Sequence, residues 1–224
     1  MTIALEQVVD MDKLANHVKL GMVSVTKHPH LPLRIYNYTQ RAQRVPGIWG
    51  DGTIDWCRGL IVDERNNIVA RPFKKFHNLN TPTIPETLEA NLPKVMPTIT
   101  EKMDGSLGIL WEWDGYTGIA TRGSFTSPQA LWASSWYQRH CFVYKNENDS
   151  PVQWPEGCTP LFEIIYKANR IVCNYEQERL VLLGLISNAS GHELDYSSIA
   201  MVAEDSLVCH AGWSKPDTYH LEND

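Results

Sequence analysis

The chain has 224 residues, of which 43% are hydrophobic, and a formal net charge of −6 at pH 7. This length and apolar content support one sizeable core, so a single domain over residues 1–224 is predicted, and the acidic balance argues against a non-specific nucleic-acid coat. The sequence contains no apolar run of membrane-spanning length and no N-terminal signal pattern, so a cytoplasmic location without membrane contact is expected.

The first part of the chain predicts a helix, a strand, a glycine-rich loop and a β-hairpin, in that order. Their expected ranges are 3–20, 33–38, 45–55 and 57–73. Apolar side chains recur at helical spacing in the first range and alternate with polar ones in the second. The hairpin is expected to turn at residues 65–67, because Asn66 and Asn67 tolerate the left-handed backbone of such turns.

The second part of the chain mixes short strands with helices. Asp114-Gly115 predicts the turn of a second hairpin, and Ser127-Pro128 predicts a helix start, with serine as the cap and proline at the first helical position. The expected elements are a short helix over 83–91, a strand over 96–100, a hairpin over 107–121, a helix to about 140, a surface loop over 145–159, strands over 161–166 and 180–186, a turn at 188–191 and a helix over 196–203.

The stretch Glu101–Ser106, Glu-Lys-Met-Asp-Gly-Ser, gathers residues that can do chemistry. A lysine kept from water loses its proton more readily and becomes a nucleophile. Asp104 would share a strand face with Lys102 and reach the lysine or a metal, while Gly105 admits close approach of a ligand. A surface Asp-Gly turn beside a solvated lysine explains the same letters, and the stretch alone favours that interpretation.

Two further stretches bear on this choice. Residues 71–78, Arg-Pro-Phe-Lys-Lys-Phe-His-Asn, mix cations with aromatic rings, which suits a polyphosphate or a nucleic-acid backbone; a basic strand end in water is an equal alternative. Glu163 is the one carboxylate in the apolar strand 161–166. Burying it is costly unless it meets a metal, a hydroxyl or a cation.

In chain order, the signals are Arg58-Gly59, Lys102-x-Asp-Gly-Ser106 and Phe162-Glu163. This order resembles the covalent nucleotidyltransferases, which comprise ATP-dependent DNA and RNA ligases and mRNA capping enzymes. The resemblance is closest to the phage RNA ligase 1 family of tRNA-repair ligases. It extends from about Tyr36 to Tyr196 and includes these further stretches: Arg71-Pro72, Lys75–Leu79, Gly123-Ser124, Ser127–Leu131 and Asn169–Val172.

The resemblance implies an α+β nucleotidyltransferase (adenylation) fold, in which antiparallel sheets form a nucleotide cleft with flanking helices. It also implies ATP, with Mg²⁺ or Mn²⁺, and an RNA partner that has 5′-phosphate and 3′-hydroxyl ends, such as broken tRNA. Lys102 would attack the α-phosphate of ATP to form lysyl-AMP. The AMP would pass to the RNA 5′-phosphate, and a 3′-hydroxyl would then displace it and join the strands, which is RNA repair.

The same resemblance assigns roles to individual residues. Arg58 and Lys75 would balance phosphate charge together with the metal, and Glu163 would hold the ribose hydroxyls or the metal. Asp104 would orient Lys102 or contact bound water. The remaining assignments are nucleotide contacts by Glu101 and Phe162, the latter also explicable as plain core, and phosphate or RNA contacts by Ser106 and Arg122.

The sequence departs from the family near its end. The family has a downstream Glu-Gly strand and a Lys-x-Lys strand that grips the α-phosphate, and neither is found; the only lysine after Lys167 is Lys215. We therefore expect an adenylyltransferase domain that is incomplete at its C-terminus, with the remainder in a longer chain or in a partner chain. Losing one such donor typically costs ~10²–10³ in rate.

Three alternatives to an RNA ligase remain open. A DNA ligase or capping-type transferase would differ in substrate and in its choice between ATP and GTP. An impaired nucleotide-binding module would bind ATP reversibly without a covalent adduct. A plain α+β domain with an accidental lysine motif would place Lys102, Arg58 and Glu163 far apart.

Overall fold

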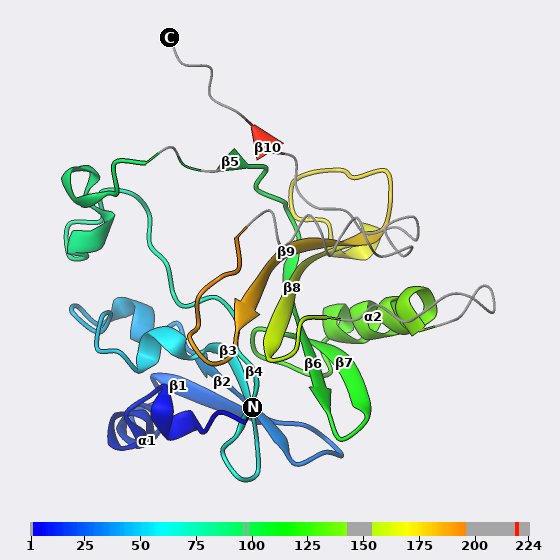
Figure 1. Cartoon of the computed structure of the whole chain (residues 1–224), viewed down its shortest axis with the longest axis horizontal. Coiled ribbons are helices and arrows are strands. Elements are labelled where there is room, and N and C mark those ends of the chain that lie inside the picture. The colour runs from blue at the N-terminus through cyan, green and yellow to red at the C-terminus, as the bar shows by residue number, and fades with distance from the viewer. Residues whose placement is uncertain (1, 96, 98, 143–153, 196–217, 220–224) are drawn as a thin grey trace.

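The computed structural model describes residues 2–95, 97, 99–142, 154–195 and 218–219. Within them lie two four-stranded antiparallel sheets, with strand orders β1-β2-β3-β4 and β7-β6-β8-β9, and one short strand pair, β5-β10 (Figure 1). The strands are β1 Val23–Lys27, β2 Leu33–Tyr38, β3 Arg58–Asp63, β4 Ile68–Ala70, β5 Ile99–Thr100, β6 Ser106–Trp113, β7 Tyr116–Thr121, β8 Cys158–Ile165, β9 Arg179–Ser187 and β10 Thr218–Tyr219. The predicted α+β class with antiparallel sheets is confirmed.

The N-terminal segment packs against the first sheet. The prediction of one helix over 3–20 is wrong, because a 3₁₀ turn, η1 Leu5–Gln7, precedes a separate helix, α1 Met11–Lys19. Asp10 has extended backbone between them, and its carboxylate accepts the N–H groups of Asp12 and Lys13, both at 3.0 Å. This cap satisfies donors that no helical carbonyl reaches and so begins the helix at residue 11.

The predicted strand 33–38 and both predicted hairpins are confirmed, and local turn chemistry explains them. Asn66 between β3 and β4 has φ 62°, and the turn between β6 and β7 has φ 49° at Asp114 and 78° at Gly115. Asparagine, aspartate and glycine adopt this left-handed backbone with little strain, so the sequence around each turn sets the hairpin register.

The second sheet is covered on one face by α2 Pro128–Tyr137, which continues as a π-helical turn at Gln138–Phe142 (Figure 1). Ser127 caps α2 by accepting the Ala130 N–H at 3.2 Å, as predicted. Ser134 then joins the helix to β7, because its hydroxyl accepts the Ile119 N–H at 2.8 Å and donates to the Ile119 carbonyl at 3.1 Å. The helix is thereby fixed to the sheet by polar contacts as well as by apolar packing.

Apolar side chains from the two large sheets meet in a shared core. Ile35 and Ile61 of the first sheet pack with Ile109 and Leu161 of the second, and all four are fully buried. Burying one such side chain contributes about 1.5–3 kcal/mol. This core fixes the first sheet, which carries Arg58, against the second, which carries Glu163.

Other predicted ranges need correction. The short helix expected over 83–91 is a pair of 3₁₀ turns, η4 Pro85–Thr87 and η5 Glu89–Asn91, and the strand expected over 96–100 is limited to β5 within the described residues. The loop expected over 145–159 ends earlier, because β8 begins at Cys158. The helix expected over 196–203 lies outside the described residues. In the described part of the chain, no helix has the length and apolar character needed to cross a membrane.

Gly59 generates a stability prediction. Its φ is 101°, and a Cβ there would lie 2.5 Å from Ile109 Cδ1 and 3.1 Å from the Arg122 Cα. Gly59→Ala is therefore expected to lower the free energy of unfolding by about 2–4 kcal/mol, from the strained φ and the overpacking together. Urea unfolding measures the loss. Gly115→Ala is the matched control, since Gly115 has φ 78° and open space around it; equal losses for the two variants would contradict the packing argument.

Candidate functional site

Lys102 lies between β5 and β6, beside the end of β8. The side chain of Lys102 is exposed, so the predicted shielding from water is absent in this structure. The strand pairing sets Leu107 opposite Glu163 and Ser106 opposite Ile164. A Cβ on Gly105 would lie 2.5 Å from the Ile164 carbonyl oxygen, so only glycine lets the lysine segment approach β8 this closely.

The Glu163 carboxylate interacts electrostatically with Lys102 and with Arg58 of the first sheet. The pKa of Glu163 is raised to about 7, chiefly by burial and also by the Asp104 charge, against the lowering effects of a Gly105 backbone hydrogen bond and of the Lys102 and Arg58 charges. Lys102, Glu163 and Arg58 are thus close enough to interact, although 61 residues separate Lys102 from Glu163 in sequence. This proximity contradicts the alternative of an accidental motif.

Arg58 is one of three neighbouring cations that each lie over an aromatic ring. The pairs are Arg58 over Phe76 at 4.9 Å, Lys75 over Trp49 at 5.6 Å and Arg122 over Tyr38 at 4.9 Å from the ring centroid. Arg122 also donates a hydrogen bond to the Tyr38 hydroxyl at 3.0 Å. The negative ring faces hold the cations without neutralising them.

The three cations influence one another. Burial, followed by the charge of Arg122, lowers the pKa of Arg58, and burial, followed by the charge of Arg58, lowers the pKa of Lys75. Among the described residues, none of the three forms an ion pair with a carboxylate. Arg58 Nη1 is buried and has no hydrogen-bond partner within the described part. Concentrated positive charge with an unused donor is the arrangement that an anion neutralises.

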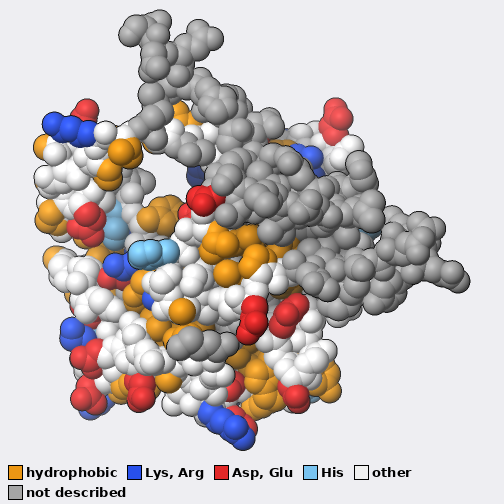
Figure 2. Space-filling model, viewed as in Figure 1, with side chains coloured by type: hydrophobic (Ala, Val, Ile, Leu, Met, Phe, Trp, Pro, Cys, Tyr) orange, Lys and Arg blue, Asp and Glu red, His pale blue; other side chains and the backbone are white. Residues whose placement is uncertain are grey.

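Figure 2 shows the molecule hollowed between the lobe that carries η4 and η5 and the main body, with cationic and histidine side chains beside the hollow.

Lys75 also donates a hydrogen bond to the carbonyl of Phe76, and its backbone N–H donates to the Asp55 carbonyl at 2.8 Å. The chain around Lys75 is therefore held in place from the buried residue Asp55.

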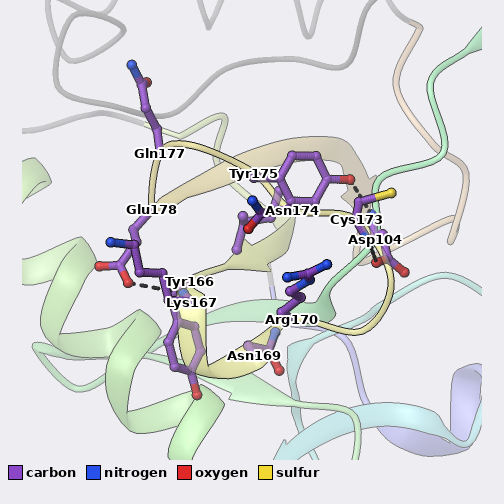
Figure 3. Close-up of a pocket in the computed structure, with 11 residues that line it drawn as sticks. Asp104, Tyr166, Lys167, Asn169, Arg170, Cys173, Asn174, Tyr175, Gln177 and Glu178 are labelled. Atoms are coloured by element: carbon purple, nitrogen blue, oxygen red, sulfur yellow. Dashed lines mark hydrogen bonds between the residues drawn. The ribbon is translucent and has the colours of Figure 1, made fainter.

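Asp104 and Ser106 make protein contacts in this structure. Asp104 was expected to share a strand face with Lys102, but β6 begins only at Ser106, so the two-residue period of a strand does not apply. Asp104 Oδ2 accepts the N–H groups of Val172 and Cys173, both at 2.7 Å. Figure 3 shows Asp104 beside Cys173. Ser106 donates its hydroxyl to Asn169 Oδ1 at 3.1 Å.

Phe162 differs from its predicted role, whereas the nucleotide contact of Glu101 stays a prediction. Phe162 is 1% exposed and lies in the core, with its ring centroid 6.3 Å from that of Tyr137 and 5.8 Å from that of Trp154. The prediction of a nucleotide contact by Phe162 is wrong for this structure, because successive strand residues face opposite sides and only Glu163 faces the lysine. Glu101 is exposed.

Sequence reasoning missed the residues that support the site. Tyr38 and Trp49 hold Arg122 and Lys75, and Tyr175 accepts the Asp104 N–H at 2.8 Å. A signal existed for Trp49, since a tryptophan stands out within a glycine-rich loop, although here it also packs against the core of the first sheet. No local pattern identifies Tyr175, because its partner is 71 residues away.

The carboxylates of the site define what metal it could accept. No cluster of three or more His, Cys, Asp and Glu side chains able to hold a metal occurs in the described ranges. Magnesium keeps several waters and commonly needs one or two carboxylates plus substrate phosphates. Glu163 could supply the single carboxylate that this requires, whereas one oxygen of Asp104 is already committed to backbone donors.

Comparison with known proteins identifies the class. A family model described as RNA ligase matches residues 56–220, most of the chain. The chain therefore belongs to this family, the phage RNA ligase 1-like nucleotidyltransferases.

Individual relatives are more distant and longer. A candidate RNA ligase of Thermovibrio ammonificans is 30% identical over 138 residues, which cover 61% of this chain and 35% of that protein. A solved structure of a lysine-to-alanine variant of the Naegleria gruberi RNA ligase, with ATP and Mn, matches at 15% identity and a TM-score of 0.38, over 55% of this chain and 35% of that one. The chain thus spans about a third of the length of both relatives.

The raised pKa of Glu163 generates a pH prediction. Because burial raises this pKa from 4.5 to about 7, the folded protein keeps a proton that the unfolded chain releases in this range. The free energy of unfolding should therefore fall by about 2–3 kcal/mol as the pH rises from about 4.5 to about 7.

Glu163→Gln should remove that fall, because glutamine does not titrate. Urea unfolding across the same pH range measures it, with Glu89→Gln, at an exposed carboxylate, as the matched control. An unchanged pH slope in Glu163→Gln would contradict the assignment.

Proposed function

We propose that this chain is the adenylylating part of an ATP-dependent RNA ligase, with Lys102 as the nucleophile. The observation that carries the proposal is the group of aromatic-supported cations, Arg58, Lys75 and Arg122, which lack carboxylate partners in the described part and adjoin Lys102 through Glu163. A triphosphate would supply these cations with the direct anionic partner that the described part of the chain does not give them.

In the first step, Lys102 Nζ attacks the α-phosphorus of ATP. The new N–P bond forms as the bond from the α-phosphorus to the oxygen bridging the α- and β-phosphates breaks, and pyrophosphate leaves with the electron pair. The attacking amine must lose a proton, and Lys102 is exposed, so bound nucleotide has to exclude the water that now surrounds it. Arg58, Lys75 and Arg122 would stabilise the charge that develops on the phosphate oxygens.

Glu163 would act on the nucleotide side of this step. Its carboxylate would hold the ribose hydroxyls or one divalent cation, and the charges of Lys102 and Arg58 favour its ionised form. Mg²⁺ or Mn²⁺ would neutralise phosphate charge there. Lys102 would thus act at the α-phosphate, and Glu163 at the ribose or the metal.

The next two steps join RNA. The AMP would pass from Lys102 to an RNA 5′-phosphate, and a 3′-hydroxyl would then attack that phosphate and release AMP. Membership of the RNA ligase family supports RNA as the substrate, and broken tRNA is the substrate class that the family resemblance suggests. Arg122, on the loop after β7, is our candidate for a cation that serves both ATP and the RNA 5′-phosphate.

Covalent labelling tests the first step. Incubation with α-labelled ATP and magnesium, followed by denaturation, is expected to leave AMP on the chain, and Lys102→Ala should abolish the label. Lys94→Ala, at another exposed lysine, is the control and should keep it. Reversible ATP binding without a covalent label would contradict the proposal and favour a nucleotide-binding module.

The phosphate assignment makes a separate prediction. Arg58→Ala and Lys75→Ala are each expected to slow adduct formation by about 10²-fold, since each removes a preorganised charge at the phosphates. Lys74→Ala is the matched control, because this neighbouring lysine is exposed and lies over Trp56 instead, at 5.8 Å. Rapid-quench measurement of the label gives the rates. Equal slowing by Lys74→Ala would show that only general charge matters.

A further inference from the structure

The lysine segment is hydrogen-bonded to a loop that follows β8 in the chain. This loop, Asn169–Tyr175, follows β8 and is here called the 169–175 loop. It borders a pocket that Asp104 also lines, and Figure 3 shows the Tyr175 hydroxyl and the backbone at Cys173 directed at Asp104. The loop and the lysine segment are therefore in direct contact, although about 70 residues separate them in sequence.

The start of the loop is fixed by Asn169, whose side chain is 8% exposed. Its Nδ2 donates to the Ile164 carbonyl at 2.8 Å, and its Oδ1 accepts the Ser106 hydroxyl at 3.1 Å and Gln129 Nε2 at 3.2 Å. One buried amide thus joins β8, β6 and α2. Buried amides of this kind are costly unless all their groups are paired, so this network specifies a single arrangement.

The middle and the end of the loop are fixed by Asp104. Its Oδ2 accepts two successive N–H groups, from Val172 and Cys173, and its own N–H donates to the Tyr175 hydroxyl at 2.8 Å. These backbone donors lower the pKa of Asp104, first through Cys173 and then through Val172. A carboxylate that accepts two short backbone hydrogen bonds is a strong anchor. The contacts leave the side chains of Ile171 and Val172 projecting, at 62% and 73% exposure.

We propose that Asp104 and Tyr175 are positioning residues, which hold the backbone of Lys102 against the 169–175 loop. This inference rests on the proposed function of Lys102 and deepens it. Asp104 lies two residues after Lys102, so its attachments set the direction in which the lysine leaves the backbone. The loop in turn becomes a rigid surface beside the attacking Lys102 amine. Asp104 contributes to adenylylation through this placement and makes no contact with nucleotide.

The test compares three substitutions with a matched control. Tyr175→Phe removes only the oxygen that accepts the Asp104 N–H, Asp104→Ala removes the whole anchor, and Asp104→Asn keeps an oxygen that can accept the same donors. Tyr116→Phe, at a tyrosine 56% exposed on β7, is the control. Two quantities are measured in the complete chain: amide hydrogen exchange over residues 102–106 and 169–175, and the rate of adduct formation as a function of ATP concentration.

We expect Asp104→Ala to speed exchange at Val172 and Cys173 by about 10-fold or more, and Tyr175→Phe to speed exchange over 102–106 by about 3–10-fold. Adduct formation should slow by about 10-fold in Asp104→Ala, while the ATP concentration for half-maximal rate stays within about 2-fold. Asp104→Asn should recover most of both effects. If Asp104 had a purely structural role, its loss would not slow adduct formation while leaving the ATP concentration for half-maximal rate unchanged.

Unchanged exchange over both segments in Tyr175→Phe and Asp104→Ala would overturn the inference. Faster exchange in the loop with unchanged exchange over 102–106 would also overturn it, because the loop would then be anchored without any effect on the lysine. If the wild-type chain forms no adduct, the proposed function fails, and the exchange data alone decide whether the attachment holds the lysine segment.

Discussion

The antiparallel pairing of β6 with β8 is the contact on which the candidate site depends. It sets Ser106 opposite Ile164 and Leu107 opposite Glu163, so the segment before β6 must run past the Glu163 side chain. Gly105 makes this possible, since any side chain there would collide with the Ile164 carbonyl. A slip of one residue would turn Glu163 into the core and Phe162 toward the lysine. The approach of the Lys102 segment to Glu163 thus follows from a backbone register.

The other half of the site depends on how its cations are supported. Arg58, Lys75 and Arg122 rest on aromatic rings and form no ion pair in the described part of the chain, while Glu163 and Asp55 act on Arg58 and Lys75 as neighbouring charges. A carboxylate partner would stabilise the free protein more, but an incoming phosphate would then have to displace it. The mutual repulsion of the three cations is a cost in the free protein that an anionic ligand removes.

Arg71 illustrates the opposite solution in the same basic stretch. It is 3% exposed, lies over Trp56 at 3.9 Å, and donates to the carbonyls of Asn188 and Ala189 at 3.0 and 3.1 Å. Its Nη1 joins the segment after β4 to the turn after β9, which is a structural role, although its buried Nε has no hydrogen-bond partner in the described part of the chain. Composition makes Arg71 and Lys75 equivalent, and only their surroundings separate the cation proposed to bind phosphate from the structural one.

Local sequence explains what could be predicted. The strand Leu33–Tyr38 and both hairpins follow from alternation and from Asn and Asp-Gly turns, each decided within a few residues. The grouping of Lys102, Arg58 and Glu163 followed from motif order, not from any local pattern. The opening helix was overextended because the Asp10 cap was overlooked. Asp104 was misplaced because its partners, Val172 to Tyr175, come from a distant loop that no periodicity reveals.

The most direct test of this account is a crystal structure of the chain with magnesium and an ATP analogue that carries a methylene between the α- and β-phosphorus atoms. The account predicts the triphosphate against Arg58, Lys75 and Arg122, the α-phosphorus in line with Lys102 Nζ, and the ribose or metal at Glu163. Nucleotide bound elsewhere, for instance in the pocket between Asp104 and the 169–175 loop, with the three cations unliganded, would contradict it.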